Sequence, residues 1–555
     1  MIKDWKILSS QKTNSLDDII KIILKNRGLS SSKEISQFIN PPHPKDLTLS
    51  DFQIDKQEVQ KAITRIKEAK SKKESVVVYT DYDADGVCGG TIIWEILHKM
   101  GLQVMPYIPD RVEEGYGLSI KGIDKIIKEF DPGLIITVDH GITGSEKIDY
   151  AKKKGIDTIV IDHHVLSKSP PLKHKAHSII HTTKLAATGV AWVFARQLHP
   201  QGIESYLDLV ALATVADLVP LIGPNRSLVK FGLEKIRNTK RIGLKALIET
   251  AGIDQSRIGV HEIGHILAPR LNAMGRLFHA LDSMRLLCTP DEDRAVELAQ
   301  KLNRTNKERQ VLTQDTVSHA HNLYLSSQNN KKLIFIAHET YNQGIIGLVA
   351  GKLVESYYRP AIVISKGEIY SKASARSING FNIIETIRTA SEFLVDSGGH
   401  PMAAGFTVKT EFIEIIQKKL EDIVEEKLTP DLLTNTLKAD CILDNNFLKT
   451  EIYRGLQILE PFGMGNPPPL FITRSLKIND IRLIGRDNKH LKLFLDIDGK
   501  NIEAVGWNFG RFYPDLLKNK FVDIAFTLKE NHWNGQTNLQ LNIEDVKIPE
   551  RQQRQ

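Results

Sequence analysis

The chain reads VVVYTDYDADG from Val76 to Gly86, an apolar run that stops at three carboxylates and a glycine. The β-branched run is typical of a buried parallel strand, and ligands bind beyond the carboxyl ends of such strands. Asp81, Asp83 and Asp85 occupy alternate positions, so an extended backbone would point them to one side. Three like charges this close repel one another unless a cation lies among them, which indicates a divalent metal. A solvated acidic loop that caps the next helix would have the same sequence pattern.

Two more strands of this region end in acidic or histidine side chains. The run 134–138 is followed by Asp139, and the run 158–161 is followed by Asp162-His163-His164. Helices are expected between these runs, and alternating strands and helices predict a parallel sheet with helices on both faces. The carboxyl ends of parallel strands share one edge, so we expect Asp139, His163 and His164 beside the first acidic cluster.

Asp217 ends another apolar run, after a helix expected at 206–215. A carboxylate in this position is exposed, paired or bound to metal, and a simple helix-end carboxylate fits as well. The candidate set is then Asp81, Asp83, Asp85, Asp139, His163, His164 and Asp217. Carboxylates with imidazoles suit Mn²⁺, and also Mg²⁺ where oxygen predominates. The carboxylates outnumber what one ion needs, so we predict two ions, which would clamp the attacking and leaving oxygens of a phosphoryl displacement.

Composition describes an ordinary globular chain. Its 555 residues predict three or four domains, and 41% hydrophobic with 25% charged residues is typical of soluble proteins. The net charge of +7 permits a basic groove without requiring one. Cys88, Cys288 and Cys441 are too scattered for a disulfide framework or a zinc ribbon. The N-terminus lacks a signal peptide and no run of 18 apolar residues occurs, so we expect a cytoplasmic protein without membrane spans.

Changes of pattern along the chain predict its domains. The expected order is an N-terminal helical segment (1–74), a parallel-sheet α/β catalytic domain (75–290), a long connecting helix (291–330), a second α/β domain (331–430), a C-terminal β-barrel (431–549) and a tail (550–555). The barrel rests on five short runs of strand-like residues between 476 and 543. Aromatic residues such as Phe494, Trp507 and Phe512 alternate there with basic ones. Such mixtures stack the bases of single strands, although a structural barrel also has core aromatics.

The second α/β region contains two small polar clusters. One is Ser374-Ala375-Arg376-Ser377 and the other is Ser397-Gly398-Gly399-His400. Glycine pairs let backbone N–H groups approach an anion, and arginine and histidine add charge. Arg276 could likewise hold a phosphate, because guanidinium matches its geometry. Each feature alone also fits a common turn or a surface arginine, but together they suggest a surface that binds phosphate or carboxylate.

In this order the motifs resemble those of the DHH phosphoesterase family. The resemblance rests on DYDADG at 81–86, VDHG at 138–141, DHH at 162–164 and AD at 216–217. SARS at 374–377 and SGGH at 397–400 resemble the DHH-associated domain of that family. With EGYG at 114–117, LNAMGR at 271–276 and PFGMGNP at 461–467, the pattern closely resembles the RecJ single-strand DNA exonucleases over residues 75–545. One departure is His181-Thr182-Thr183, where the family usually has an Asn-Pro turn.

The resemblance implies a fold of a parallel-sheet DHH domain, a connecting helix, a DHH-associated domain and an oligonucleotide-binding-fold-like barrel. It also implies 5′ to 3′ hydrolysis of single-stranded DNA to 5′ mononucleotides, in DNA repair and recombination. The implied metal ligands are Asp83, Asp85, Asp139, His163 and Asp217, with Asp85 and Asp139 bridging two Mn²⁺ or Mg²⁺ ions. Asp81 would be a further ligand or would orient the others, and His164 would touch the scissile phosphate. Phosphates or the terminal nucleotide would be held by Arg276, Ser374, Arg376, His400, Gly398, Gly399 and Arg111.

Two other functions remain open at this point. A phosphoesterase for short oligonucleotides or cyclic dinucleotides would share the metal motifs, although the long helix and the barrel favour a longer substrate. A non-catalytic scaffold of the same fold would be expected to lose ligands, and all of them are present here. The resemblance further implies a monomer that acts on single-stranded DNA with a helicase and a single-strand-binding protein.

Overall fold

The computed structural model describes residues 3–165, 175–326, 331–533 and 536–549. It divides the chain into two compact units, Pro42–Leu433 and a second unit of Met1–Pro41 with Thr434–Gln555. The sequence predicted one helical segment over 1–74, and this is wrong for its first part. Strand β1 (Asp4–Ser9) forms there and pairs in parallel with β12 (Thr436–Ile442). This pairing joins residues more than 400 positions apart, so no local sequence pattern could predict it. The other domain boundaries stay predictions.

A five-stranded parallel sheet forms the core of the first part of the 42–433 unit, as the sequence predicted. Its order is β3 (Gln103–Tyr107), β2 (Ser75–Thr80), β4 (Leu134–Val138), β5 (Asp157–Asp162) and β6 (Ser178–His181). Alternation along β2 explains why both faces are covered. Val76 and Val78 face one hydrophobic core, whereas Val77 and Tyr79 face another. The sheet is therefore buried on both sides, and only its strand ends are open to ligands.

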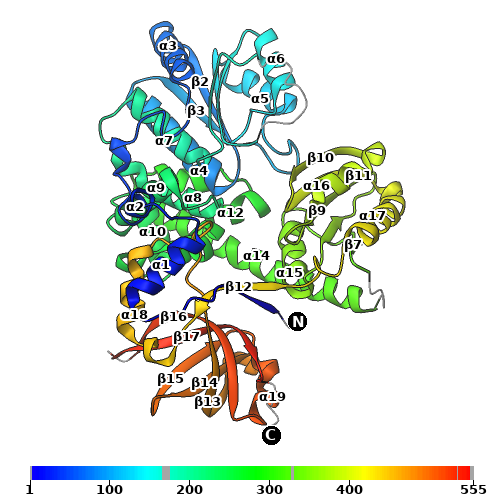
Figure 1. Cartoon of the computed structure of the whole chain (residues 1–555). Helices are drawn as coiled ribbons and strands as arrows, with labels where there is room; N and C mark the ends of the chain where they lie inside the picture. The colour runs from blue at the N-terminus through cyan, green and yellow to red at the C-terminus, as the bar shows by residue number, and fades with distance from the viewer. Residues whose placement is uncertain (1–2, 166–174, 327–330, 534–535, 550–555) are drawn as a thin grey trace. The chain divides into compact units, whose positions relative to one another are not determined.

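Helices pack on both faces of this sheet (Figure 1). The larger core includes α3 (Lys56–Lys72), α4 (Ala84–Lys99) and α7 (Ala187–Leu198). The smaller core includes α5 (Ile120–Phe130) and α6 (Ser145–Lys153). Further helices extend the larger core: α8 (Leu207–Ala216), α9 (Gly223–Arg237), α10 (Ile242–Thr250), α12 (Ala268–Leu277) and α13 (Leu281–Cys288).

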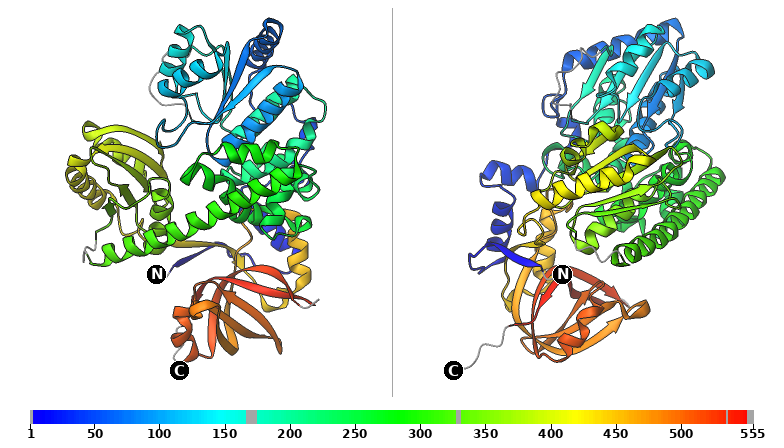
Figure 2. Two further views of the ribbon diagram at one scale, coloured as in Figure 1. Left: turned by 180° about the vertical axis from the view of Figure 1, so that it is seen from behind. Right: turned by 90° about the vertical axis from the view of Figure 1, so that its right-hand side faces the viewer.

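The long helix α14 (Glu292–Ser326) leads to a second sheet, and both agree with the sequence prediction (Figure 2). The second sheet has the order β10 (Leu394–His400), β11 (Ala403–Lys409), β9 (Tyr370–Arg376), β8 (Ala361–Ser365) and β7 (Ile334–His338). Helices α14 and α15 (Ile346–Tyr357) share a core with one face. Helices α16 (Ile383–Arg388) and α17 (Ile413–Lys427) cover the other face.

The second unit is a β-barrel with an N-terminal cover. Its strands are β13 (Phe471–Ile484), β14 (His490–Ile497), β15 (Lys500–Gly506), β16 (Phe521–Trp533) and β17 (Gln536–Lys547), and they coincide with the five predicted runs. Strand β13 pairs with both β14 and β16, which closes the barrel. Helix α1 (Leu16–Asn26) is fixed to it by a buried ion pair of 2.8 Å between Arg27 and Asp440. Among the residues described, no helix is both long and apolar enough to span a membrane.

Candidate metal site and the arginine cluster beside it

The ends of β2, β4 and β5 bring the predicted acidic and histidine side chains together. Asp81, Asp139 and His163 directly follow these three strands. Asp83 is the N-cap of α4, where its Oδ1 accepts hydrogen bonds from the backbone N–H groups of Asp85 (2.9 Å) and Gly86 (3.1 Å). Asp217 joins from the C-terminal end of α8. We call Asp81, Asp83, Asp85, Asp139, His163, His164 and Asp217 the acidic site.

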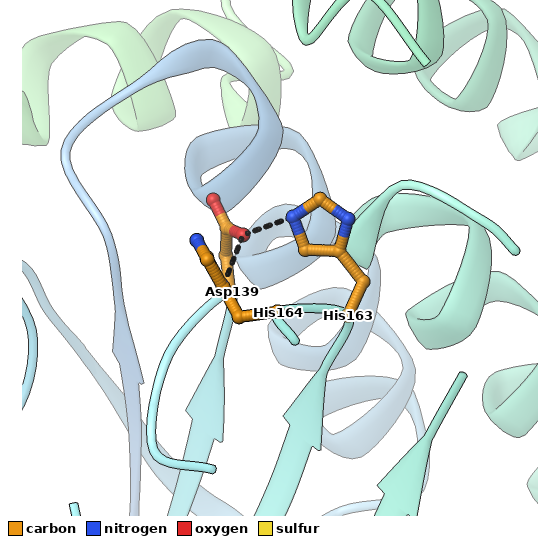
Figure 3. A group of neighbouring side chains, drawn as sticks. All are labelled: Asp139, His163 and His164. Atoms are coloured by element: carbon orange, nitrogen blue, oxygen red, sulfur yellow. Dashed lines mark ion pairs between the residues drawn. The ribbon is translucent and has the colours of Figure 1, made fainter. Parts of the chain in front are cut away.

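Three overlapping groups in the acidic site could each hold a metal ion. The groups are Asp139 with His163 and His164, Asp85 with His163 and Asp217, and Asp81 with Asp83 and Asp139. Within each group, each residue offers one potential ligand atom, and these atoms lie within 4.8 Å of one another. Nε2 of His163 is 3.3 Å from Oδ1 of Asp139 and 3.7 Å from Oδ2 of Asp217. Figure 3 shows Asp139 between the two histidines. Asp139 and His163 each belong to two of the groups, so they form the centre of the site.

Burial and mutual repulsion make the charged form of the carboxylates in this site unfavourable. Burial and the neighbouring Asp85 and Asp83 raise the pKa of Asp139 well above its usual range. Burial and Asp83 do the same to the pKa of Asp81, and burial with Asp85 and Asp83 raises the pKa of Asp217 to about 8. Oδ1 of Asp81 and Oδ1 of Asp139 are buried without a hydrogen bond. Unpaired buried acceptors and mutually repelling carboxylates are what a divalent cation would neutralise, so the donor set fits a metal.

Asp85 has a second set of contacts that the sequence did not predict. Its Oδ2 and Oδ1 accept hydrogen bonds from the backbone N–H groups of Ala187 (2.7 Å) and Thr188 (2.8 Å). Asp85 therefore caps the N-terminus of α7, and each oxygen keeps one lone pair for another partner. These hydrogen bonds fix the side chain in position beside His163.

Asp162 orients the adjacent histidine. Its carboxylate accepts hydrogen bonds from the backbone N–H groups of Ile142, His163 and His164, and from Nδ1 of His164 at 2.8 Å. Burial opposes the charge of both partners, but their mutual hydrogen bond lowers the pKa of Asp162 and raises that of His164. Asp162 therefore orients the ring of His164 and favours its protonated form within the acidic site. Its Nε2 lies 3.0 Å from the hydroxyl of Tyr116.

The predicted phosphate-binding residues of the second sheet lie on neighbouring strands. Arg376 follows Ser374 on β9, and its Nη1 donates to the Ser374 hydroxyl at 3.1 Å. Gly398, Gly399 and His400 lie on β10, and the His400 ring stacks against that of His164 with centroids 6.2 Å apart. Gly399 has φ of +138°, and a Cβ there would meet the Ala403 carbonyl oxygen at 2.4 Å, so this position requires glycine. The contact between His400 and His164 links this surface to the acidic site.

Four arginines gather beside the acidic site. Burial and the guanidinium groups of Arg111, Arg309 and Arg376 lower the pKa of Arg276 to about 9. No carboxylate in the described part of the chain forms an ion pair with any of these four, which we call the arginine cluster. Arg111 lies over the Tyr82 ring, 4.2 Å from its centroid. Nη1 of Arg276 donates to the Gly344 carbonyl at 3.1 Å. Uncompensated, partly buried cations of this kind favour an anionic ligand.

Three residues of this region were missed by sequence reasoning. Arg309 lies on α14, and its Nε is buried without a hydrogen bond. Tyr116 contacts both the Asp139 carbonyl and His164. Asn272 accepts a hydrogen bond of 2.7 Å from the Ala84 N–H, which fixes the start of α4. Tyr116 and Asn272 lie within the EGYG and LNAMGR motifs, so the sequence could have indicated a role for them. Arg309 lies in a long charged helix, where no motif distinguishes it.

The sequence left open whether the aromatic side chains of the barrel stack bases or form its core. Trp507 is 56% exposed and contacts the His490 ring, which leaves it free to stack on a ligand. Phe494 lies under the cationic groups of Arg482 and Lys492. Phe512, by contrast, packs against the hydrophobic core. Exposed and structural aromatics are therefore both present.

Family models match three separate parts of the chain. The model described as "DHH family, N-terminal domain" matches residues 75–214 and "DHHA1 domain" matches residues 329–426. The model "RecJ OB domain" matches residues 439–545. These three matches correspond to the parallel sheet, the second sheet and the barrel.

Similar proteins extend the match to nearly the whole chain. The single-stranded-DNA-specific exonuclease RecJ of Bacillus subtilis is 34% identical over 98% of this chain and 70% of that protein. The crystal structure of RecJ from Thermus thermophilus in complex with Mn²⁺ is similar with a TM-score of 0.82 and 28% identity, over 99% of this chain and 80% of that one. The structure of RecJ from the same organism in complex with Mg²⁺ gives a TM-score of 0.77 and 26% identity, over 99% and 79% of the two chains.

Proposed function

The chain belongs to the RecJ family of single-stranded-DNA-specific exonucleases, and we propose that it removes 5′ mononucleotides from single-stranded DNA in the 5′ to 3′ direction. It is a metal-dependent exonuclease. The observation that supports this site is that Nε2 of His163 lies 3.3 Å from Oδ1 of Asp139 and 3.7 Å from Oδ2 of Asp217, so one imidazole is within reach of both carboxylates.

The cofactor is a divalent metal, and RecJ of Thermus thermophilus has been solved with Mn²⁺ and with Mg²⁺. We propose two ions, with Asp83, Asp85, Asp139, His163 and Asp217 as ligands and Asp81 as a further ligand or an orienting residue. Three ligand groups support this count, since two of them overlap at Asp139 and two at His163. When bound, such ions supply an activated water and neutralise charge on the phosphodiester.

The chain's own residues would hold the scissile phosphate in line with this site. His164 is oriented by Asp162 through Nδ1, so Nε2 is the atom that would contact a phosphate oxygen, in place of its contact with the Tyr116 hydroxyl. Tyr116 holds the ring of His164 from the other side through its hydroxyl. The imidazole therefore has a fixed direction, which an in-line displacement requires.

The arginine cluster would bind the strand beside the cleaved bond. Arg276, Arg376 and Ser374 hold phosphates, with Arg111 alongside, and Gly398, Gly399 and His400 border them on β10. We add Arg309 to this set, because its guanidinium shares the cluster and has no counter-ion in the described residues. Several phosphates of a strand can neutralise four cations, whereas the one or two phosphates of a dinucleotide cannot, and this favours a longer oligonucleotide.

The wider role follows from the family. We propose that the chain acts in DNA repair and recombination in the cytoplasm, as a monomer, with a helicase and a single-strand-binding protein as partners. The barrel would add contacts to the strand, since exposed Trp507 is suited to stacking bases.

The polarity and the substrate class can be tested together. A single strand labelled at its 5′ end and the same strand labelled at its 3′ end would be digested with Mn²⁺, beside a linear dinucleotide and a cyclic dinucleotide. The proposal expects immediate release of the 5′ label as a mononucleotide and slow shortening of the 3′-labelled strand. Faster turnover of either dinucleotide would favour the alternative, a phosphoesterase for short oligonucleotides or cyclic dinucleotides.

A further inference from the structure

Two histidines lie stacked on the surface, away from the residues assigned above. His261 is in α11 (Val260–Glu262) and His265 is in the π-helical turn Ile263–Leu267 that continues into α12. Their rings have centroids 4.7 Å apart and planes inclined by 17°. Both side chains are exposed, with His261 at 67%. We call His261 and His265 the histidine pair.

The hydrogen bonds of the pair select one tautomer in both rings. Nδ1 of His261 is 3.3 Å from Oε1 of Glu262, and Nδ1 of His265 is 3.3 Å from the His261 carbonyl oxygen. A carboxylate and a carbonyl can only accept, so both Nδ1 atoms must carry the proton. A neutral ring then has a bare Nε2 with a free lone pair. Metal-binding histidines commonly have this arrangement, with the second nitrogen donating to a carboxylate or a backbone carbonyl.

The surrounding residues favour a two-histidine site over a catalytic zinc site. The sequence His261-Glu262-Ile263-Gly264-His265 matches the H-E-x-x-H motif of zinc peptidases, in which the glutamate is a general base. Here Oε2 of Glu262 instead accepts the Gly259 N–H at 2.9 Å, so the carboxylate is engaged at the start of the helix. In the described part of the chain, every group of three or more clustered potential ligands lies in the acidic site.

We propose that the histidine pair binds one first-row transition-metal ion of the class that imidazole prefers, such as Ni²⁺, Cu²⁺ or Zn²⁺, through the two Nε2 atoms. Imidazole ligands prefer these ions to Mg²⁺ and Mn²⁺, whereas the acidic site, with its carboxylates and histidines, can bind ions of both classes. The ring planes are inclined by only 17°, so the rings must turn out of this stack before both lone pairs can meet one ion, and the broad second torsion of histidine permits this. Water would complete the coordination, since both rings are open to solvent. The ion would link two consecutive turns across the junction between α11 and the π-helical turn.

The test is a Ni²⁺ titration of the full, tag-free chain in excess Mg²⁺, followed by calorimetry. The variants are His261→Ala and His265→Ala, and His279→Ala is the matched control. His279 is also exposed, but its Nδ1 accepts from the Leu281 N–H, and no second histidine ring stacks on it in the described structure. Equal thermal unfolding midpoints without Ni²⁺ would establish that the variants are folded.

The expected result is one Ni²⁺ equivalent in the parent chain, in addition to any held by the acidic site, that weakens at least tenfold in each single variant of the pair. His279→Ala should retain it. Asp139→Asn, which alters only the acidic site, should retain it as well, so the result stands apart from the nuclease function. Parent-like Ni²⁺ binding by either His261→Ala or His265→Ala would overturn the proposal, as would the absence of this equivalent from the parent chain.

Discussion

Nε2 of His163 lies 3.3 Å from Oδ1 of Asp139, across the ends of two neighbouring parallel strands. The register of the sheet produces this contact: Val138 of β4 pairs with Ile161 of β5, and the Asp139 N–H donates to the Ile161 carbonyl at 2.9 Å. Asp139 has φ of +68°, a left-handed conformation that Asp and Asn tolerate better than most residues. Sheet register and a left-handed turn thus create the centre of the proposed metal site.

Asp139→Asn should stabilise the metal-free protein while removing metal binding. The folded-state pKa of Asp139 is raised by burial and by neighbouring carboxylates, so its charge costs folding free energy at neutral pH. Asparagine removes that charge and keeps the left-handed turn. In EDTA at pH 8 the free energy of unfolding should therefore rise above that of the parent chain. Added Mn²⁺ should raise the unfolding midpoint of the parent chain only, and a midpoint lower than the parent's in EDTA would contradict this view.

Metal affinity should rise with pH through the titration of Asp217. The pKa of this carboxyl is about 8 in the folded metal-free protein, against 3.8 as its ordinary value. A raised folded-state pKa means that the metal-free protein loses stability as pH rises from about 4 towards 8. A metal ligand must be ionised, so Mn²⁺ must displace the proton, and affinity should increase up to about tenfold per pH unit between pH 6 and 8. Titrations at three pH values would measure this slope. Asp217→Asn should flatten it, whereas a pH-independent parent affinity would count against Asp217 as a ligand.

Arg309→Ala should weaken binding of single-stranded DNA, and Arg304→Ala should not. Both arginines lie on α14, but Arg309 is half-buried in the arginine cluster whereas Arg304 is exposed. Loss of one phosphate contact should cost about 1 kcal/mol or more and reduce the slope of log affinity against log salt by about one. Anisotropy of a labelled strand at several salt concentrations, without metal, gives both quantities. Equal slopes for the two variants would remove Arg309 from the proposed binding surface.

Gly344→Ala should damage the site, although Gly351→Ala should be harmless. A Cβ at Gly344 would lie 2.0 Å from the Arg276 carbonyl oxygen, so the turn before α15 would have to move away from Arg276. Gly351 lies within α15 and its Cβ would meet nothing within 4 Å. We expect Gly344→Ala to lose about 1–3 kcal/mol of stability and to raise KM. Gly351→Ala should gain about 0.5–1 kcal/mol, because alanine favours a helix. Unfolding curves and steady-state kinetics for both variants would separate the two effects.

Local patterns were sufficient for the strands and the acids that follow them. The runs before Asp81, Asp139 and His163 are β-branched and buried on both faces, and a parallel sheet brings such ends together whatever the rest of the fold does. The long α14 and the five barrel strands also had clear periodicity. For these elements the sequence carries the information locally.

Contacts that depend on tertiary structure were not predictable in the same way. Asp85 caps α7, about 100 residues along the chain, and Arg309 reaches the arginine cluster only because α14 passes beside α12. The pairing of β1 with β12 joins segments more than 400 residues apart. None of these has a local signature, since each depends on where a distant segment lies.

The most direct test of the central claim is the release of nucleotides from a uniformly labelled single strand by the parent chain and by Asp139→Asn, with Mn²⁺ and with EDTA. The account predicts mononucleotide release by the parent with Mn²⁺ and none with EDTA. It predicts a loss of about a hundredfold to a thousandfold in Asp139→Asn, by analogy with the removal of one preorganised group from an active site. Circular dichroism should show that this variant is folded. Undiminished release by folded Asp139→Asn, or release by the parent in EDTA, would contradict the assignment of catalysis to a metal held at the ends of β2, β4 and β5.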